Sequence, residues 1–262
     1  MAATVQEIKQ MLLQANDESF AVLERSLSAD TRKGVRSAVE STRRRLEAQR
    51  AEAARLNGLY EFQESIAAER GGRVVLGLDE VGRGSIAGPL AVGGVVLPDE
   101  PHIQGLNDSK QLSPAKREEI ADQVRQTAIA WTVQYVEPNV IDSIGMTASL
   151  RRAFSSAIAQ IEKAGIEVDV VLLDGNAMHL DKREVNVIKG DARCASIAAA
   201  SIVAKVERDA LMTRYAVEYP QYDLEDCKGY GSAKHIAAIK QHGLSPIHRA
   251  SFCTSFMQET LF

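Results

Sequence analysis

Residues 73–84 read RVVLGLDEVGRG, an apolar run followed by two acids and a glycine-flanked turn. The run over 73–79 has the length and β-branched content of a buried strand, and it leads directly into Asp79 and Glu80. Two adjacent acids at the end of a buried strand are costly unless a partner offsets their charge. Successive strand residues point to opposite faces, so we expect the chain to turn at Glu80 if both acids enter one site.

Further apolar runs, separated by polar segments, follow along the chain. They predict strands over residues 90–97, 129–136, 168–174 and 185–188, and helices over residues 139–163 and 192–219. Three strands, a helix, two strands and a helix are typical of an α/β protein. We therefore predict a mixed five-stranded sheet flanked by helices, with a C-terminal helical region.

The first seventy residues differ in composition from the rest. Residues 1–70 contain 11 basic and 11 acidic side chains, no proline and mostly helix-forming residues. We expect a small helical N-terminal extension over 1–70, a division near Gly71-Gly72, and the main domain over 71–262. Seven basic residues between positions 32 and 50 indicate a basic face. This face is either a solvated helix surface or an arm that grips a nucleic-acid duplex.

Composition excludes several classes of protein. A chain of 262 residues with 45% hydrophobic and 25% charged residues can bury a core, and its net charge of −4 argues against coating nucleic acid through bulk positive charge. Its three cysteines, Cys194, Cys227 and Cys253, form no C-x-x-C pair, as is usual in a reducing compartment. The longest uncharged run, 84–98, is too short to span a bilayer. We expect a cytoplasmic protein, and a monomer.

Two further acids repeat the theme of Asp79 and Glu80. Asp174 ends the run VVLLD, and Asp191 stands at the mouth of a long apolar helix. Taken singly, Asp174 could open a turn and Asp191 could cap the helix. Together, we expect the four carboxylates, at two strand ends and a helix start, to converge on one point. There they would need hard cations that prefer oxygen ligands, Mg²⁺ or Mn²⁺. Two such ions about 3.5–4 Å apart would clamp the attacking and leaving oxygens of a phosphodiester.

Six segments resemble, in order, the motifs of bacterial ribonuclease HII. They read GLDEVGRGSIAGPL, LNDSKQLSPAKRE, VVLLDGN, IKGDARCASIAAASIVAKVERD, CKGYGSAKH and SPIHRASF, and extend from about residue 74 to 252. The resemblance implies a ribonuclease H-like fold in which Asp79, Glu80, Asp174 and Asp191 are the metal-binding catalytic acids. An aspartate at position 191 favours this family over ribonuclease HIII, whose set ends with glutamate. Ser85 stands where many relatives have proline, and we expect only a local backbone effect.

The resemblance also points to residues that contact substrate. Gly82-Arg83-Gly84 lets the backbone approach a ribose 2′-hydroxyl, the group that distinguishes RNA from DNA, although an isolated element of this kind is more often a tight turn. Tyr230, between two glycines, is presented outward for stacking, and in relatives this tyrosine contacts the nucleotide at the RNA–DNA junction. The alternative for Tyr230 is a half-buried side chain that closes a loop.

Lysines and histidines nearby are weaker candidates. Lys110 and Lys228 are candidate phosphate ligands or, equally, solvated surface lysines. His235, His242 and His248 have no zinc-like spacing, so we interpret them as structural or phosphate-facing.

The function implied is that of a metal-dependent endoribonuclease with two divalent ions, Mn²⁺ or Mg²⁺. It would hydrolyse the RNA strand of RNA–DNA hybrids and cut 5′ of single ribonucleotides in duplex DNA, leaving 3′-hydroxyl and 5′-phosphate ends, as in ribonucleotide repair and primer removal. A DNA-junction nuclease of the same fold and a non-catalytic hybrid-binding module are the alternatives. The first gives no reason for the G-R-G element, and the second has no use for four converging acids.

The C-terminal tail resembles a docking peptide. It reads QETLF from Gln258 to Phe262 and is similar to the Q-x-x-L-F peptide by which bacterial replication and repair proteins bind the sliding clamp. The alternative is that Leu261 and Phe262 pack back on the fold.

Overall fold

The computed structural model describes residues 3–257. Contacts divide the chain into two units, residues 1–57 and residues 58–262, and the division falls inside the helix α3 (Lys33–Glu69). This division and the predicted one near Gly71-Gly72 therefore differ, because the last part of α3 packs with the second unit. Each unit is described below by itself.

The first unit consists of α1 (Val5–Gln14), α2 (Asp17–Ser26) and the beginning of α3. Its core is a small apolar cluster that includes Ile8, Leu12 and Phe20, all buried. Thr4 and Glu7 form a capping box at the start of α1, which satisfies two amides that the first helical turn leaves unpaired. In this unit, α1, α2 and the beginning of α3 thus pack together through one small apolar core.

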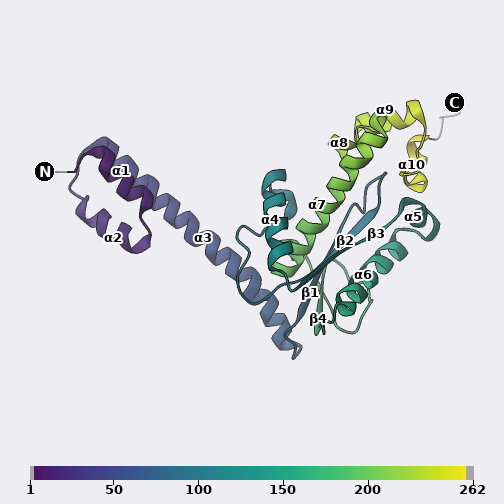
Figure 1. The fold of residues 1–262 in the computed structure, drawn as a ribbon, viewed down its shortest axis with the longest axis horizontal. Helices are drawn as coiled ribbons and strands as arrows, with labels where there is room; N and C mark the ends of the chain where they lie inside the picture. Colours follow the sequence, from purple (N-terminus) through teal and green to yellow (C-terminus); the bar gives the residue numbers. More distant parts are fainter. Residues whose placement is uncertain (1–2, 258–262) are drawn as a thin grey trace. The chain divides into compact units, whose positions relative to one another are not determined.

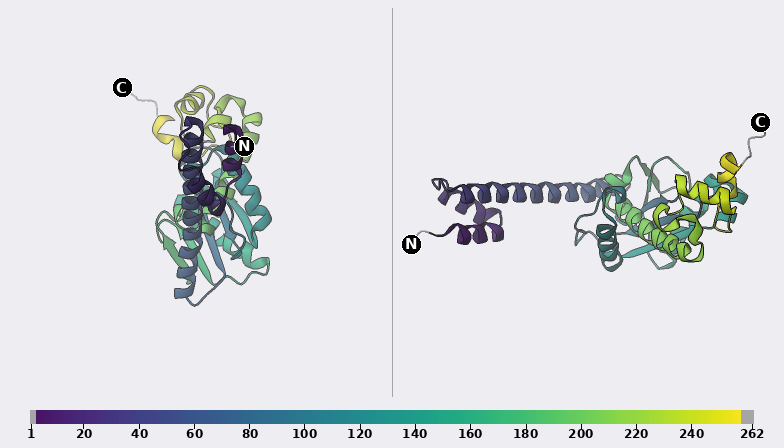
Figure 2. Two further views of the ribbon diagram at one scale, coloured as in Figure 1. Left: turned by 90° about the vertical axis from the view of Figure 1, so that its left-hand side faces the viewer. Right: turned by 90° about the horizontal axis from the view of Figure 1, so that it is seen from above.

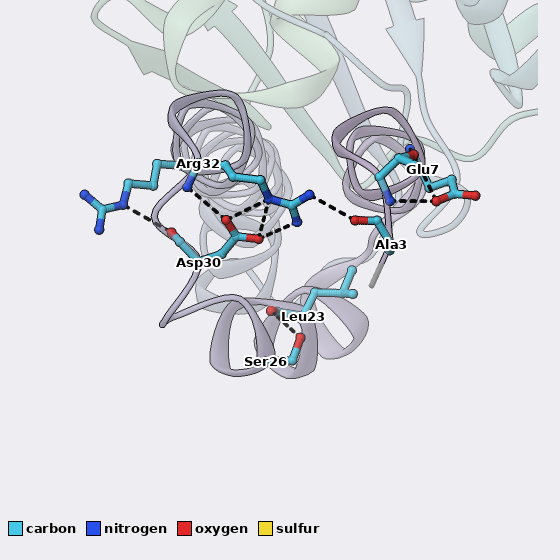
Figure 3. Close-up of polar contacts among 8 residues, drawn as sticks. Ala3, Glu7, Leu23, Ser26, Asp30 and Arg32 are labelled. Atoms are coloured by element: carbon cyan, nitrogen blue, oxygen red, sulfur yellow. Dashed lines mark hydrogen bonds and ion pairs between the residues drawn. The ribbon is translucent and has the colours of Figure 1, made fainter. Parts of the chain in front are cut away.

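Arginines of the basic stretch pair with acids inside this unit. Arg32 bonds both carboxylate oxygens of Asp30 and also donates to the Ala3 carbonyl, as Figure 3 shows. Further ion pairs join Arg43 to Glu24, Arg44 to Glu40 and Arg50 to Asp17. These pairs offset much of the positive charge and favour the interpretation as a salt-bridged, solvated helix surface.

The second unit contains the mixed five-stranded sheet that the sequence predicts. Its strands are β1 (Val75–Val81), β2 (Leu90–Val96), β3 (Ala130–Val136), β4 (Val170–Asp174) and β5 (Glu184–Val187). Their order is β3-β2-β1-β4-β5, antiparallel between β1, β2 and β3 and parallel between β1, β4 and β5. β1 extends past Asp79, since Glu80 still pairs with Val92. The ends of the central strands β1 and β4 carry the acids.

Helices cover both faces of this sheet (Figure 1). α7 (Ala195–Glu218) and α4 (Pro114–Thr127) lie on one face, and α5 (Pro138–Ile144) and α6 (Met146–Lys163) on the other. The single helix predicted over 139–163 is wrong, because Gly145 has φ 80° and divides it. The helix predicted from residue 192 begins at Ala195, because Gly190–Ala192 forms the 3₁₀ turn η2.

Glycines let α7 lie unusually close to the sheet. A Cβ on Gly77 of β1 would overlap the backbone of Ser196, and one on Gly93 of β2 would overlap the Ala200 carbonyl. The residues of α7 that face the strands are accordingly small, Ala198 to Ala200 being fully buried. This close approach brings the polar residues of α7 alongside Asp79.

Of the remaining helical segments, η1 (Ser109–Gln111) contacts α7 through the hydroxyls of Ser109 and Ser201, and the others gather around the C-terminal end of α7 (Figure 2). They are η3 (Pro220–Tyr222), α8 (Leu224–Cys227), α9 (Ala233–His242) and α10 (Ala250–Met257), and they share the apolar cluster around Met212 and Tyr222. In the part of the chain that the structure describes, no helix is long and apolar enough to cross a bilayer. The QETLF tail lies outside the described residues.

The last part of α3 belongs to the second unit. Phe62, Ile66 and Ala67 pack with the apolar cluster of β1, β4 and α7. The Gln63 side-chain oxygen accepts a hydrogen bond of 3.0 Å from the Ser196 amide, which lies in the first turn of α7. Tyr60 accepts one of 3.1 Å from the Ile103 amide. The Gln63 bond thus holds the start of α7, and the Tyr60 bond holds the segment that follows β2.

Candidate active site

A cleft of about 480 Å³ opens where β1 and β4 end. Its lining includes most of the predicted site residues, namely Asp79, Glu80, Gly82, Arg83, Gly84, Lys110, Asp174 and Tyr230. Segments far apart in the chain thus meet here, as expected for the carboxyl ends of neighbouring parallel strands. Asp191 lies beside the cleft and contacts it through Lys110, whereas Lys228 lines a neighbouring groove.

Asp79 is the most deeply buried of the four acids, with 5% of its surface exposed. Burial raises its pKa to about 8, and the nearby charges of Glu80 and Asp174 act in the same direction. Hydrogen bonds to Ser201 and to the Glu80 amide, the latter 2.8 Å long, oppose this rise only in part. A carboxyl group in this position ionises readily only if a cation offsets its neighbours.

Glu80 and Asp174 experience the same two effects. Burial raises the pKa of Glu80, and Arg83, 3.4 Å from its carboxylate, counteracts this. Burial also raises the pKa of Asp174, although the Gly190 amide donates a 2.6 Å hydrogen bond to its Oδ1, and the charge of Asp191 adds to the rise. Mutual repulsion therefore links the four acids into one electrostatic cluster.

Asp191 has a cationic partner from the protein itself. Asp191 is buried, with 7% of the residue exposed, and its carboxylate lies 3.2 Å from the ammonium of Lys110, whose side chain is 78% exposed. Asp191 lies inside η2 and does not cap α7, whose N-cap residue is Cys194. Among residues 3–257, no three His, Cys, Asp or Glu side chains form a ready-made metal cluster. The candidate ligand atoms are nonetheless all carboxylate oxygens, and their negative charges repel one another. A hard divalent cation prefers such oxygen ligands and would offset this repulsion.

The glycine turn and Tyr230 line the same cleft as the acids. Gly82 has φ 86°, and a Cβ there would overlap the guanidinium of Arg208, whereas a Cβ on Gly84 would meet open space. Gly229, with φ 82°, accepts hydrogen bonds from the amides of Ile86 and Ala87 and places Tyr230 beside the turn. Tyr230 is 40% exposed, as its glycine-flanked position predicts.

Three polar residues of the cleft were not predicted from the sequence. Ser109 and Ser201 are buried, with their hydroxyl oxygens 3.0 Å apart, and Ser201 also bonds Asp79. Lys205 lines the cleft and pairs with Asp209 at 2.9 Å. For Ser201 and Lys205 the sequence does contain a signal. They are polar residues four positions apart, on one face of a helix that is otherwise apolar there.

Lys228 points away from the acids. Its ammonium donates a 2.7 Å hydrogen bond to the Thr213 hydroxyl, and it lines a groove of about 800 Å³ that shares Lys110 and Lys205 with the cleft. Its assignment as a phosphate ligand stays a prediction, as does that of Lys110.

Two of the three histidines are structural. His248 accepts from the Ser245 amide at Nδ1, so its Nε2–H donates to Nε2 of His235, 3.0 Å away, and His235 Nδ1 donates to the Tyr230 carbonyl at 2.9 Å. Burial lowers the pKa of both imidazoles, that of His248 to about 4. This neutral relay fixes the main chain at Tyr230.

Known proteins match both parts of the chain. The family model of ribonuclease HII matches residues 76–255, and that of the ribonuclease HII N-terminal domain matches residues 4–67. Ribonuclease HII of Listeria monocytogenes is 37% identical over 252 residues, which cover 96% of this chain and 95% of the relative. Ribonuclease HII of Ruminiclostridium cellulolyticum is 41% identical over 207 residues, 78% of this chain and 79% of the relative.

Solved structures show the same fold. Ribonuclease HII of Archaeoglobus fulgidus, solved in complex with PCNA, has a TM-score of 0.60 and 26% identity over 71% of this chain and 98% of its own. Bst-RNase HIII in complex with Mn²⁺ has a TM-score of 0.60 at 18% identity, covering 74% of this chain and 72% of its own, and it supports the fold alone. From the family models and the curated relatives, this chain belongs to the ribonuclease HII family of nucleases.

Proposed function

We propose that this chain is a divalent-metal-dependent endoribonuclease that hydrolyses the RNA strand of RNA–DNA hybrids and cuts 5′ of single ribonucleotides in duplex DNA. The observation that carries the proposal is the meeting of Asp79, Glu80 and Asp174 in one cleft that the glycine turn and Tyr230 also line. Membership of the ribonuclease HII family supports it. The raised pKa values of these three carboxyl groups support the metal requirement, because a divalent cation would offset their mutual repulsion.

Asp79, Glu80, Asp174 and Asp191 would hold two Mg²⁺ or Mn²⁺ ions. Such ions supply an activated water and offset charge on the leaving oxygen. Asp191 can join the set when Lys110 releases it, which an ammonium on a largely exposed side chain does by rotating about its side-chain bonds. Ser201 and the Glu80 amide orient the Asp79 carboxylate in the meantime.

In this proposal the glycine turn and Tyr230 select the sugar. Backbone groups of Gly82-Arg83-Gly84 approach the ribose closely because no side chain stands at Gly84, and a 2′-hydroxyl can bond them where deoxyribose cannot. Tyr230 stacks on the adjacent nucleotide. The 2′-hydroxyl serves as a recognition group while water is the nucleophile, so the products carry 3′-hydroxyl and 5′-phosphate ends. Lys110, Lys205 and Lys228 contact backbone phosphates.

The C-terminal tail is a separate proposal. The relative from Archaeoglobus fulgidus was solved with PCNA, and the QETLF tail resembles a clamp-binding peptide. We expect the full chain to bind a bacterial sliding clamp in a pull-down and a chain lacking residues 258–262 not to bind. Equal capture of both chains would contradict this.

Cleavage of a duplex with one ribonucleotide tests the proposed activity directly. With Mg²⁺ or Mn²⁺ we expect one cut, 5′ of the ribonucleotide, and the Asp79→Asn and Asp174→Asn variants should lose at least about a thousandfold in kcat because each removes a metal ligand. Asp122→Asn is the matched control, since Asp122 is an exposed acid of α4 outside the cleft, and it should cut normally.

Two outcomes would contradict the proposal. One is cleavage that survives Asp79→Asn or added chelator. The other is cleavage of an all-DNA duplex at the same rate, which would instead identify a DNA nuclease.

A further inference from the structure

Two arginines are buried beside the glycine turn without an acidic partner. Arg208 of α7 and Arg249, just before α10, are both 0% exposed, and among the described residues neither has a carboxylate oxygen within 4.0 Å. Burial and the positive charge of Arg208 together lower the pKa of Arg249 to about 9. Two like charges buried together are expensive, so this arrangement needs a compensating bond network.

All of the side-chain hydrogen bonds found for these arginines go to main-chain carbonyls. Arg249 donates twice to Gly88, at 3.0 and 2.9 Å, and once to Arg83, at 3.2 Å. Arg208 donates to Ala87 at 3.1 Å, to Pro89 at 2.9 Å and to Lys228 at 2.9 Å. The acceptors lie in two segments, 83–89 and the residue two before Tyr230. Arg208 therefore ties the segment that follows the glycine turn to the loop that carries the tyrosine, and Arg249 ties the turn itself, at Arg83, to Gly88.

Arg208 also packs against both elements through its flat faces. Its central carbon lies 5.7 Å from the centroid of the Tyr230 ring. A Cβ on Gly82 would overlap the same guanidinium, so the turn rests directly on it. The ammonium of Lys205 also lies 6.0 Å from the centroid of the Tyr230 ring, and cations this close restrict how the ring tilts.

We propose that Arg208 and Arg249 are positioning residues that set the distance between the Gly82–Gly84 turn and Tyr230, and thereby the fit of the ribonucleotide between them. The inference rests on the proposed function, in which both elements contact the substrate. Neither arginine touches the substrate, because both are fully buried. Lysine cannot substitute, since a single ammonium does not reach three carbonyls in a fixed plane.

A double-mutant cycle separates positioning from general stabilisation. We would measure kcat/KM on the single-ribonucleotide duplex for wild type, Arg208→Lys, Tyr230→Ala and the double variant, well below the melting temperature of each. If Arg208 acts through Tyr230, Arg208→Lys lowers kcat/KM by about tenfold in the wild-type background and by less than about twofold in the Tyr230→Ala background. Arg249→Lys, in the same cycle, serves if Arg208→Lys does not fold.

Arg125→Lys is the control for a disturbed α7. Arg125 joins α4 to Glu207 of α7 at 2.9 Å and lies outside the cleft, so its substitution should change stability and leave kcat/KM within about twofold. An equal loss in both Tyr230 backgrounds, or no loss at all, would overturn the inference while leaving the proposed activity intact. A wild-type protein that does not cut the duplex would overturn both.

Discussion

At the residue scale, Asp79 is a group whose charge the fold opposes. Burial raises its pKa to about 8, and its carboxyl has no cationic side chain within 4.0 Å among the described residues. The folded protein without metal therefore holds a proton on Asp79 that the unfolded chain releases near pH 4. Its contribution to stability is present below pH 4 and is lost as pH rises toward 8.

Asp79→Asn should remove this pH dependence. In chelator, the free energy of unfolding of wild type relative to the variant should fall between pH 5 and pH 8, by at most about 1.4 kcal/mol per pH unit, as measured by urea titration at each pH. Adding Mg²⁺ should restore stability to wild type more than to the variant. Parallel pH profiles for the two proteins would show that Asp79 is ionised in the metal-free fold.

Ser85 carries a cost of a different kind. It is fully buried, and among the described residues its hydroxyl has no hydrogen-bond partner. Ser85→Ala should raise the free energy of unfolding by about 1 kcal/mol in a urea titration, because an unsatisfied buried hydroxyl is removed. Ser85→Pro should gain less, because it also removes the amide that donates to the Gly82 carbonyl at 3.2 Å. A destabilised alanine variant would be evidence of a partner for the hydroxyl.

Residue-level chemistry explains which parts of the site were predictable. Carboxylates at strand ends are conspicuous in a sequence, because charge interrupts an apolar run, and Asp79, Glu80 and Asp174 do line one cleft. Arg208 was not predictable, since a buried arginine bonded to carbonyls looks in sequence like any helix-surface arginine. Only the tertiary contacts with residues 83–89 reveal its role.

At the element scale, periodicity predicted the five strands and the alternation with helices, because burial selects apolar residues at a fixed period. It failed where a single backbone angle decides the boundary. Gly145 ends α5 and starts α6, but the helical spacing of apolar residues continues across it. The hydrophobic pattern therefore does not mark this boundary. The turn η2 likewise displaced the start of α7 because its bonds are local and leave no periodic trace.

Gly77→Ala should separate α7 from β1. The added methyl would overlap the Ser196 backbone, so we expect a loss of about 1–3 kcal/mol in unfolding free energy and a fall in kcat, since Ser201 and Asp79 lie on the same interface. Gly58→Ala is the matched control, because a Cβ there meets nothing within 4 Å and alanine favours the helix, and it should stabilise by up to about 1 kcal/mol. Equal stabilities for the two variants would mean that α7 can shift freely.

At the scale of the whole molecule, α3 belongs to both units. A chain beginning at residue 58 keeps Tyr60, Gln63 and the apolar residues that pack with β1 and α7, whereas one beginning at residue 71 loses them. We expect the melting temperature of the longer form to be close to that of the second unit in the full chain. The shorter form should lose about 2–5 kcal/mol of unfolding free energy, because it lacks these apolar contacts. Calorimetry of the two truncations measures this, and equal melting temperatures would contradict it.

Because α3 is shared between the two units, its backbone hydrogen bonds should open in two separate groups. Backbone amides in one continuous helix would ordinarily open together, but those of residues 33–57 depend on the small apolar core of the first unit and those of residues 58–69 on the sheet core. Opening free energies follow the cooperative unit to which an amide belongs. Deuterium should therefore exchange into α3 at two distinct rates, with the change near Asn57. One continuous helix would then report the separate opening free energies of the two units.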